Sequence, residues 1–184
     1  MDNGASSYRR FLEGDDSGMV ELVREYKDGL MLYINSFTND IYLAEDCVQE
    51  TFIKLATKTP KFNGRSSFKT WLFTIGRNTA LSLLKSRYRH TAEPLDEMKH
   101  YPAETDLEQE YLVEEQKAAL YKAIQKIKSD YRQVLILVYI EGFTSDETCK
   151  IMNKTKKQVD NLLYNARKAL RSELEKEGFQ YEKL

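Results

Sequence analysis

Apolar residues recur at the spacing of amphipathic helices through the first half of the chain. One stripe between residues 19 and 37 predicts a first helix, and a stripe between residues 47 and 55 predicts a second. A third helix is expected from about Phe68 to Arg89, and no alternating strand pattern competes with it. We therefore predict a small helical bundle over residues 1–92. The three stripes comprise Met19, Leu22, Val23, Tyr26, Leu30, Tyr33 and Phe37; Cys47, Val48, Thr51, Phe52 and Leu55; and Phe68, Trp71, Leu72, Ile75 and Thr79.

Two segments interrupt the helical pattern. The segment 58–67 contains Pro60 and the pair Asn63-Gly64, which are turn signals, and it ends in two serines that can cap the next helix. Residues 91–110 hold two of the three prolines of the chain and many acidic residues, which is linker composition. We therefore expect a flexible acidic linker over 93–110 and a second helical domain over 111–184.

The second domain carries the pattern of a helix-turn-helix. A cap at Ser129 or Asp130 is expected to begin an apolar helix that ends at Gly142. Two capping boxes follow, Thr144 to Glu147 and Thr155 to Gln158, and the tight turn 152–154 lies between the helices that they open. In this arrangement the second helix enters the major groove of DNA.

Charge is arranged in blocks that nearly cancel. The chain has 28 Lys+Arg against 29 Asp+Glu, and its pI near 6.2 alone would argue against nucleic acid. However, the net charge is -7 over residues 1–50, +9 over 51–92, -8 over 93–116 and +5 over 117–184. The block 51–92 contains no carboxylate, which predicts a local positive field for an anionic partner. The alternative is a solvated basic face paired with acidic neighbours in the fold.

Several classes of protein are disfavoured by the composition. Cys47 and Cys149 stand apart without ligand-spaced partners, so neither a disulfide framework nor a metal site is expected. His90 and His100 belong to no catalytic constellation, so we expect neither an enzyme nor a cofactor. The polar start lacks a secretory signal, and no apolar run could insert into a membrane, which predicts a cytoplasmic protein.

The motifs together resemble the extracytoplasmic-function class of bacterial sigma factors. The resemblance rests on the segments 44–52 (AEDCVQETF), 68–80 (FKTWLFTIGRNTA), 131–135 (YRQVL), 141–144 (EGFT) and 166–171 (ARKALR), which occur in the family's order across residues 15–175. It implies an all-α chain of two small helical domains that binds core RNA polymerase, directs it to promoters and helps to open the DNA. It also implies a possible anti-sigma factor as a partner, and it implies no catalytic activity.

The resemblance assigns roles to residues of the first domain. Asp46, Gln49 and Glu50, opposite the apolar face of their helix, would dock on the clamp helices of the polymerase's largest subunit. Asn78 would read a flipped base of the minus-ten element, in a pocket shaped by the loop 61–65. Cations and exposed rings would hold the melted strand, whereas Phe52, Phe68 and Trp71 are expected to be core residues. The remaining minus-ten candidates are Phe62, Asn63, Arg65, Lys69, Phe73, Arg77, Lys85 and Arg87, of which Phe62 and Phe73 are the rings expected to be exposed.

The second domain would read the minus-thirty-five element and contact the polymerase flap. Its last helix departs from the family, with Asp160, Leu162 and Asn165 where basic residues are common. Contacts are therefore expected to shift toward its first turns. The minus-thirty-five candidates are Lys154, Lys156, Lys157, Gln158, Asn161 and Arg167. A conventional helix-turn-helix regulator that binds a palindrome as a dimer is the alternative, although two different basic domains favour an asymmetric site.

Overall fold

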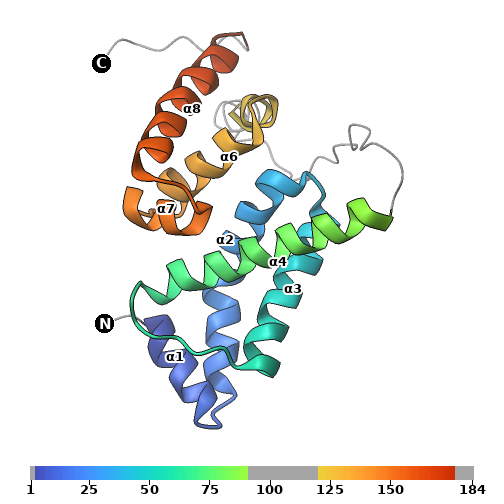
Figure 1. Cartoon of the computed structure of the whole chain (residues 1–184), viewed down its shortest axis with the longest axis vertical. Helices are drawn as coiled ribbons and strands as arrows, with labels where there is room; N and C mark the ends of the chain where they lie inside the picture. Colours follow the sequence, from blue (N-terminus) through green and yellow to red (C-terminus); the bar gives the residue numbers. More distant parts are fainter. Residues whose placement is uncertain (1–2, 91–119, 177–184) are drawn as a thin grey trace, which may run out of the picture.

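The computed structural model describes residues 3–90 and 120–176, and within these residues every regular element is a helix. The prediction of an all-α chain with two helical units is therefore confirmed (Figure 1). The linker predicted over 93–110 lies outside the described residues, as does the side chain of Arg89. In chain order the helices are α1 (Asn3–Leu12), α2 (Ser17–Thr38), α3 (Ile41–Lys58), α4 (Phe68–His90), α6 (Ser129–Leu135), the π-helix η1 (Ile136–Ile140), α7 (Ser145–Met152) and α8 (Lys156–Lys176), and residues 120–126 are also helical.

The first unit is built from the three predicted stripes. Residues of α2, α3 and α4 meet in one apolar core, in which Leu30, Leu55 and Leu72 are fully buried. The carboxylate of Asp40 caps α3 by accepting a 3.0 Å hydrogen bond from the backbone N–H of Leu43. As expected, a serine precedes α4, where the Ser67 hydroxyl accepts a 3.2 Å hydrogen bond from the Thr70 N–H.

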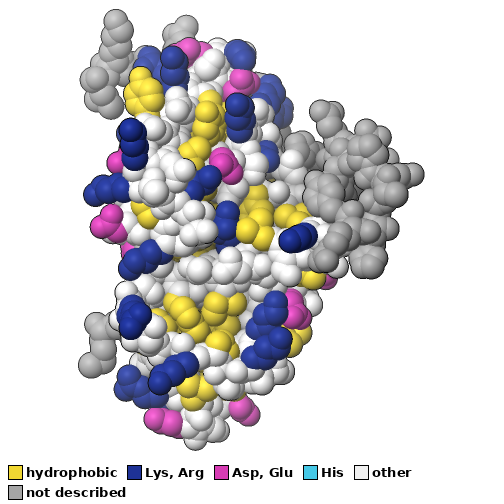
Figure 2. All heavy atoms as spheres, viewed as in Figure 1, with side chains coloured by type: hydrophobic (Ala, Val, Ile, Leu, Met, Phe, Trp, Pro, Cys, Tyr) yellow, Lys and Arg dark blue, Asp and Glu magenta, His cyan; other side chains and the backbone are white. Residues whose placement is uncertain are grey.

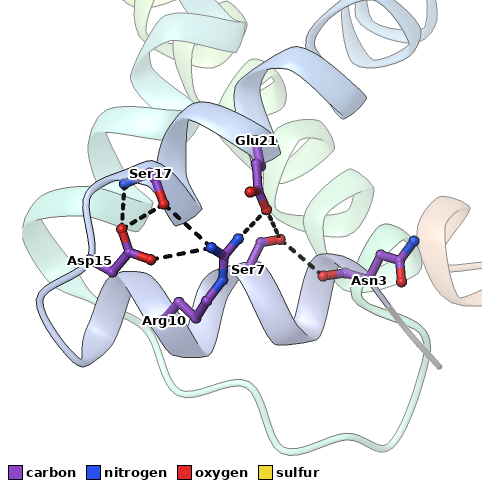
Figure 3. Close-up of polar contacts among 6 residues, drawn as sticks. All are labelled: Asn3, Ser7, Arg10, Asp15, Ser17 and Glu21. Carbon is purple, nitrogen blue, oxygen red and sulfur yellow. Dashed lines mark hydrogen bonds and ion pairs between the residues drawn. The ribbon is translucent and has the colours of Figure 1, made fainter.

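The helix α1 was not predicted, and it attaches to the bundle mainly by polar and aromatic contacts. The Arg10 guanidinium bridges the carboxylates of Asp15 and Glu21, and Glu21 also accepts a 2.7 Å hydrogen bond from the Ser7 hydroxyl (Figure 3). Asp15 in turn accepts a 3.0 Å hydrogen bond from the backbone N–H of Ser17. Hydrogen bonds from Arg10 and Ser7 lower the pKa of Glu21. This network fixes the turn between α1 and α2.

The second unit confirms the predicted helix-turn-helix. Helix α6 begins at Ser129, so the expected cap at Ser129 or Asp130 is wrong: Lys128 is the N-cap residue, and no side chain caps the helix. The apolar run continues as η1, and Gly142 follows with φ +71°, a left-handed conformation that suits glycine. Both capping boxes are formed, at Thr144 with Glu147 and at Thr155 with Gln158. The turn between α7 and α8 passes through Asn153 in the left-handed region.

The two units pack against one another, with α7 on α4 and with α6 and η1 on α2. Figure 1 shows α7 beside the N-terminal half of α4. Arg132 of α6 is buried and donates a 2.9 Å hydrogen bond from Nε to the Ser36 carbonyl at the end of α2. Burial lowers the pKa of Arg132. The sequence predicts two units but gives no indication of this contact.

Candidate nucleic-acid interface

Helix α3 presents an acidic and amide face away from the core. Cys47 and Val48 are buried, whereas Asp46 and Gln49 are exposed and Glu50 is half-buried. Glu50 lies 3.5 Å from Lys54 on the next turn, and Lys54 donates a 3.2 Å hydrogen bond to the Thr79 hydroxyl of α4. Helix α4 therefore holds the orientation of α3, and Asp46 and Gln49 remain exposed on a fixed backbone.

The loop between α3 and α4 holds its polar tip in a compact turn. The Asn63 side-chain oxygen accepts a 3.1 Å hydrogen bond from the Arg65 N–H, and Gly64 between them has φ +69°, which disfavours a side chain. Asn63 and Arg65 are exposed. Phe62 instead points toward the bundle, with its ring 5.2 Å from that of Trp71 and 5.6 Å from that of Phe68. The expectation that Phe62 is an exposed ring is therefore only half correct, because it is half-buried.

The remaining minus-ten candidates on α4 differ in their exposure to solvent. Asn78 is exposed beside the buried Thr79. Arg77 is half-buried. Burial of Tyr33 raises the pKa of its hydroxyl, and the nearby Arg77 guanidinium offsets part of that rise. Lys85 and Arg87 are exposed, and Arg87 forms a 3.2 Å ion pair with Asp40 at the start of α3.

Phe73 was expected to be exposed, and this prediction is wrong. Its side chain is fully buried, with its ring 5.0 Å from that of Phe143 in the second unit and 5.8 Å from that of Tyr33. Lys69, one turn earlier, also contacts the second unit through a 2.9 Å ion pair with Glu141. Both residues therefore lie in the contact between the two units.

The helix-turn-helix places most of its candidates at the start of α8. Lys157, Gln158 and Asn161 are exposed. Lys156 lies 3.8 Å from Asp146 of α7, and the half-buried Lys154 lies 3.2 Å from Asp130 of α6. About three turns after Lys156, the Arg167 guanidinium lies over the Tyr139 ring at 5.5 Å. Lys and Arg side chains are spread over both units on the face drawn in Figure 2.

Three polar residues of the contact between units were missed from the sequence. The capping box of α7 is a sufficient reason for a glutamate at position 147. The carboxylate of Glu147 also accepts hydrogen bonds from Ser67 at 3.0 Å and Thr70 at 2.9 Å. Hydroxyl residues and a capping glutamate carry no signal of a partner some 80 positions away.

The described part of the chain contains no cluster of three or more metal-ligating side chains. Among the same residues, no helix has both the length and the hydropathy required to cross a membrane.

Comparison with known proteins identifies relatives over most of the chain. Residues 22–90 match Sigma-70 region 2, and residues 117–170 match Sigma-70, region 4. The RNA polymerase sigma-H factor of Pseudomonas aeruginosa is 31% identical over 170 residues, which cover 88% of each chain. The RNA polymerase sigma factor YlaC of Bacillus subtilis is 26% identical over 85% of this chain and 91% of the relative.

A solved structure shares the arrangement of helices. The sigma factor RpoE from Bartonella quintana, crystallised in complex with the anti-sigma factor NepR, is 25% identical, with a TM-score of 0.62. The match covers 84% of this chain and 97% of the relative.

Proposed function

Because the chain belongs to the extracytoplasmic-function family of RNA polymerase sigma factors, we propose that its two helical units divide promoter recognition between them. The protein binds core RNA polymerase, directs it to specific promoters and assists promoter opening. Sigma factors are initiation factors rather than enzymes. In our proposal, residues 1–92 dock on the polymerase and read the minus-ten element, and residues 111–184 read the minus-thirty-five element. Residues 93–110 link the two.

The observation that carries the assignment within the first unit is that two of its helices present exposed polar side chains. Asp46 and Gln49 are exposed on α3, and Asn78 is exposed on α4. In our proposal, Asp46, Gln49 and Glu50 bind the clamp helices of the largest polymerase subunit. An exposed carboxylate and amide on a rigid helix suit a polar protein surface.

The minus-ten surface is proposed to comprise the loop tip and the exposed side of α4. Asn78 offers an amide that can donate to and accept from one base edge, and Asn63 and Arg65 lie at the tip of the loop that would border a flipped base. Cations along α4 would bind the backbone of the melted strand. Phe62 would act mainly by shaping the loop from below, since its ring packs on Trp71. The α4 cations of this surface are Lys69, Arg77, Lys85 and Arg87, and the buried Phe73 would join it only when its ring leaves Phe143.

The minus-thirty-five surface is proposed to be the first turns of α8. Lys156 and Lys157 are suited to phosphates near the start of the helix, and Gln158 and Asn161 to base edges. Lys154 and Arg167 would extend the phosphate contacts on either side. The second unit would also touch the polymerase flap.

A cytoplasmic location and an anti-sigma partner complete the proposal. Transcription by core polymerase takes place in the cytoplasm, so the chain would act there. The RpoE relative forms a complex with an anti-sigma factor, and a regulator of this kind is proposed for this chain too.

The test is transcription from a candidate promoter by core polymerase with the purified chain. Asn78→Ala is expected to impair promoter opening while polymerase binding remains. Asp46→Arg is expected to impair polymerase binding itself. Two controls match these changes: Ser82→Ala, exposed one turn after Asn78, and Glu13→Arg, exposed in the turn after α1. Both should behave as the wild type. Tight binding to a palindrome without polymerase, and no transcription with it, would contradict the proposal.

A further inference from the structure

The contact between the two units covers residues of the proposed minus-ten surface with carboxylates. Glu147 of α7 accepts hydrogen bonds from the hydroxyls of Ser67 and Thr70, at 3.0 Å and 2.9 Å, at the start of α4. Lys150, one turn later on α7, donates a 3.4 Å hydrogen bond to the Arg65 carbonyl in the minus-ten loop. The loop and the first turn of α4 are thus held by the helix-turn-helix.

Lys69 is held by a second carboxylate. Its ammonium forms a 2.9 Å ion pair with Glu141 and donates a 2.8 Å hydrogen bond to the carbonyl of the same residue. The ammonium also lies 4.9 Å from the centre of the Phe143 ring and 5.7 Å from that of Phe73. The Glu141 side chain is only 11% exposed. This environment is partly shielded from water, so the pair is stronger than an ion pair in free solvent.

The carboxylates and a DNA backbone compete for the same groups. Lysine and hydroxyl side chains are typical phosphate contacts, and a carboxylate presents two oxygens of the same charge sign as a phosphodiester. A phosphate could reach Lys69 only against repulsion from Glu141 and Glu147. Phe73 cannot meet a base while its ring is buried against Phe143. The surface is therefore either bound to the second unit or available to DNA.

We infer that Glu141 and Glu147 act as an intramolecular mimic of the DNA backbone, so that the second unit masks the minus-ten surface until the two units separate. This inference rests on the proposed minus-ten surface. Ser67 and Thr70 join that surface as residues that the sequence did not suggest. The free chain is then closed, and its affinity for single-stranded DNA is limited by the release of two carboxylates. Binding of both units to core polymerase would supply the free energy that separates them.

The decisive variant removes the two charges and keeps the shapes. Glu141→Gln combined with Glu147→Gln replaces each carboxylate by an amide, and glutamine at position 147 still completes the capping box. Binding of a fluorescein-labelled single-stranded oligonucleotide of mixed sequence is measured by anisotropy on the full chain. Several charge-assisted hydrogen bonds are lost, so we expect affinity to rise about tenfold. Small-angle X-ray scattering should show a larger radius of gyration for the variant.

The matched control has the same change of net charge at the far end of α8. Glu173→Gln combined with Glu175→Gln alters carboxylates whose ion pairs, within the described residues, are with Lys176 and Arg171 of the same helix. It should change affinity by less than about twofold, the size of a surface charge effect. Adding Lys69→Gln to the first double variant should reverse most of its gain. An equal rise in both double variants, or a gain that persists without Lys69, would overturn the masking.

Transcription with core polymerase separates this inference from the proposed function. Retained transcription together with unchanged affinity for the oligonucleotide would overturn the masking alone. Failure of the wild-type chain to direct transcription would overturn the proposed function, and the masking inference with it.

Discussion

The Tyr8 hydroxyl of α1 donates a 2.9 Å hydrogen bond to the carbonyl of Pro60, 52 residues further along the chain. The Tyr8 ring is 2% exposed, with its centre 5.5 Å from those of Phe68 and of Trp71. Pro60 begins the loop whose tip carries Asn63 and Arg65. Helix α1 therefore anchors the start of the loop that belongs to the proposed minus-ten surface.

Tyr8→Phe keeps the ring and removes only this hydrogen bond. We expect the free energy of unfolding to fall by about 1 kcal/mol, the usual net value of one hydrogen bond, because the Pro60 carbonyl loses its tyrosine partner. Promoter opening, followed by permanganate reactivity of the melted strand with core polymerase, should fall while polymerase binding is unchanged.

Tyr42→Phe is the control for the Tyr8 variant, because the Tyr42 side chain is 71% exposed at the start of α3. It should leave both stability and opening unaltered. Unchanged opening in Tyr8→Phe, despite the expected loss of stability, would show that the loop does not depend on this anchor.

Cys47 should report global unfolding of the first unit. Burial is the main cause that raises the pKa of its thiol to about 11, and its side chain is fully buried. The thiolate is the reactive form. In a Cys149→Ser background, we expect a thiol reagent near neutral pH to modify Cys47 only as fast as the unit unfolds. Denaturant should accelerate the reaction in step with the loss of helical circular dichroism. Rapid modification of the native protein would contradict the burial of this face of α3.

The sequence predicts the helices whose buried residues are apolar and recur at helical spacing. It misses α1, whose buried residues do not form such a pattern. The stripes of α2, α3 and α4 are read directly from residues such as Leu22, Leu55 and Leu72, which all lie in the core. In α1 the buried residues are Gly4, Ser7 and Tyr8. A glycine and a serine give no hydrophobic period, because their contribution is close approach and a hydrogen bond.

The same distinction applies to the candidate site. The exposure of Asp46 and Gln49 follows from their place opposite an apolar stripe, and the structure agrees. Phe73 lies off the stripe, so local periodicity predicts exposure. It is nevertheless buried by Phe143, 70 residues away. A contact between units is set by the tertiary arrangement, which periodicity within one helix does not contain.

The contribution of Glu147 to stability should depend on pH in one direction. Burial alone would raise the pKa of its carboxyl, but hydrogen bonds from Thr144, Thr70 and Ser67 outweigh burial and lower it. A carboxyl whose pKa is lowered by folding stabilises the protein above its unfolded pKa of about 4.3 and loses that effect as pH falls through the folded pKa.

The measurement compares urea unfolding of the wild type and Glu147→Gln across pH. The wild type should be the more stable near neutral pH, and its advantage should be constant there. It should shrink as the pH falls from about 4.3 through the lower folded pKa, below which the carboxyl is protonated in both states. A difference that does not vary with pH would mean that the ionised carboxylate is not what Ser67 and Thr70 hold.

Gln158 has two roles that can be separated by substitution. Its side-chain oxygen accepts hydrogen bonds from the Thr155 N–H at 2.8 Å and from the Thr155 hydroxyl at 3.1 Å, which completes the capping box of α8. The amide nitrogen is the donor that we propose for a base edge. Gln158→Glu keeps the cap and removes this donor, whereas Gln158→Ala removes both. Only Gln158→Ala should therefore destabilise the second unit, by about 1 kcal/mol.

Both Gln158 variants should lose discrimination at one base pair of the minus-thirty-five element. The readout is the relative affinity of polymerase holoenzyme for promoters that differ at a single position. It is preferred to total affinity because the added charge in Gln158→Glu weakens binding to all sequences alike. Loss of a good base contact should reduce discrimination by about 1–3 kcal/mol at that position alone. If both variants keep the wild-type ranking at every position, Gln158 serves only as a cap and base reading falls to Asn161.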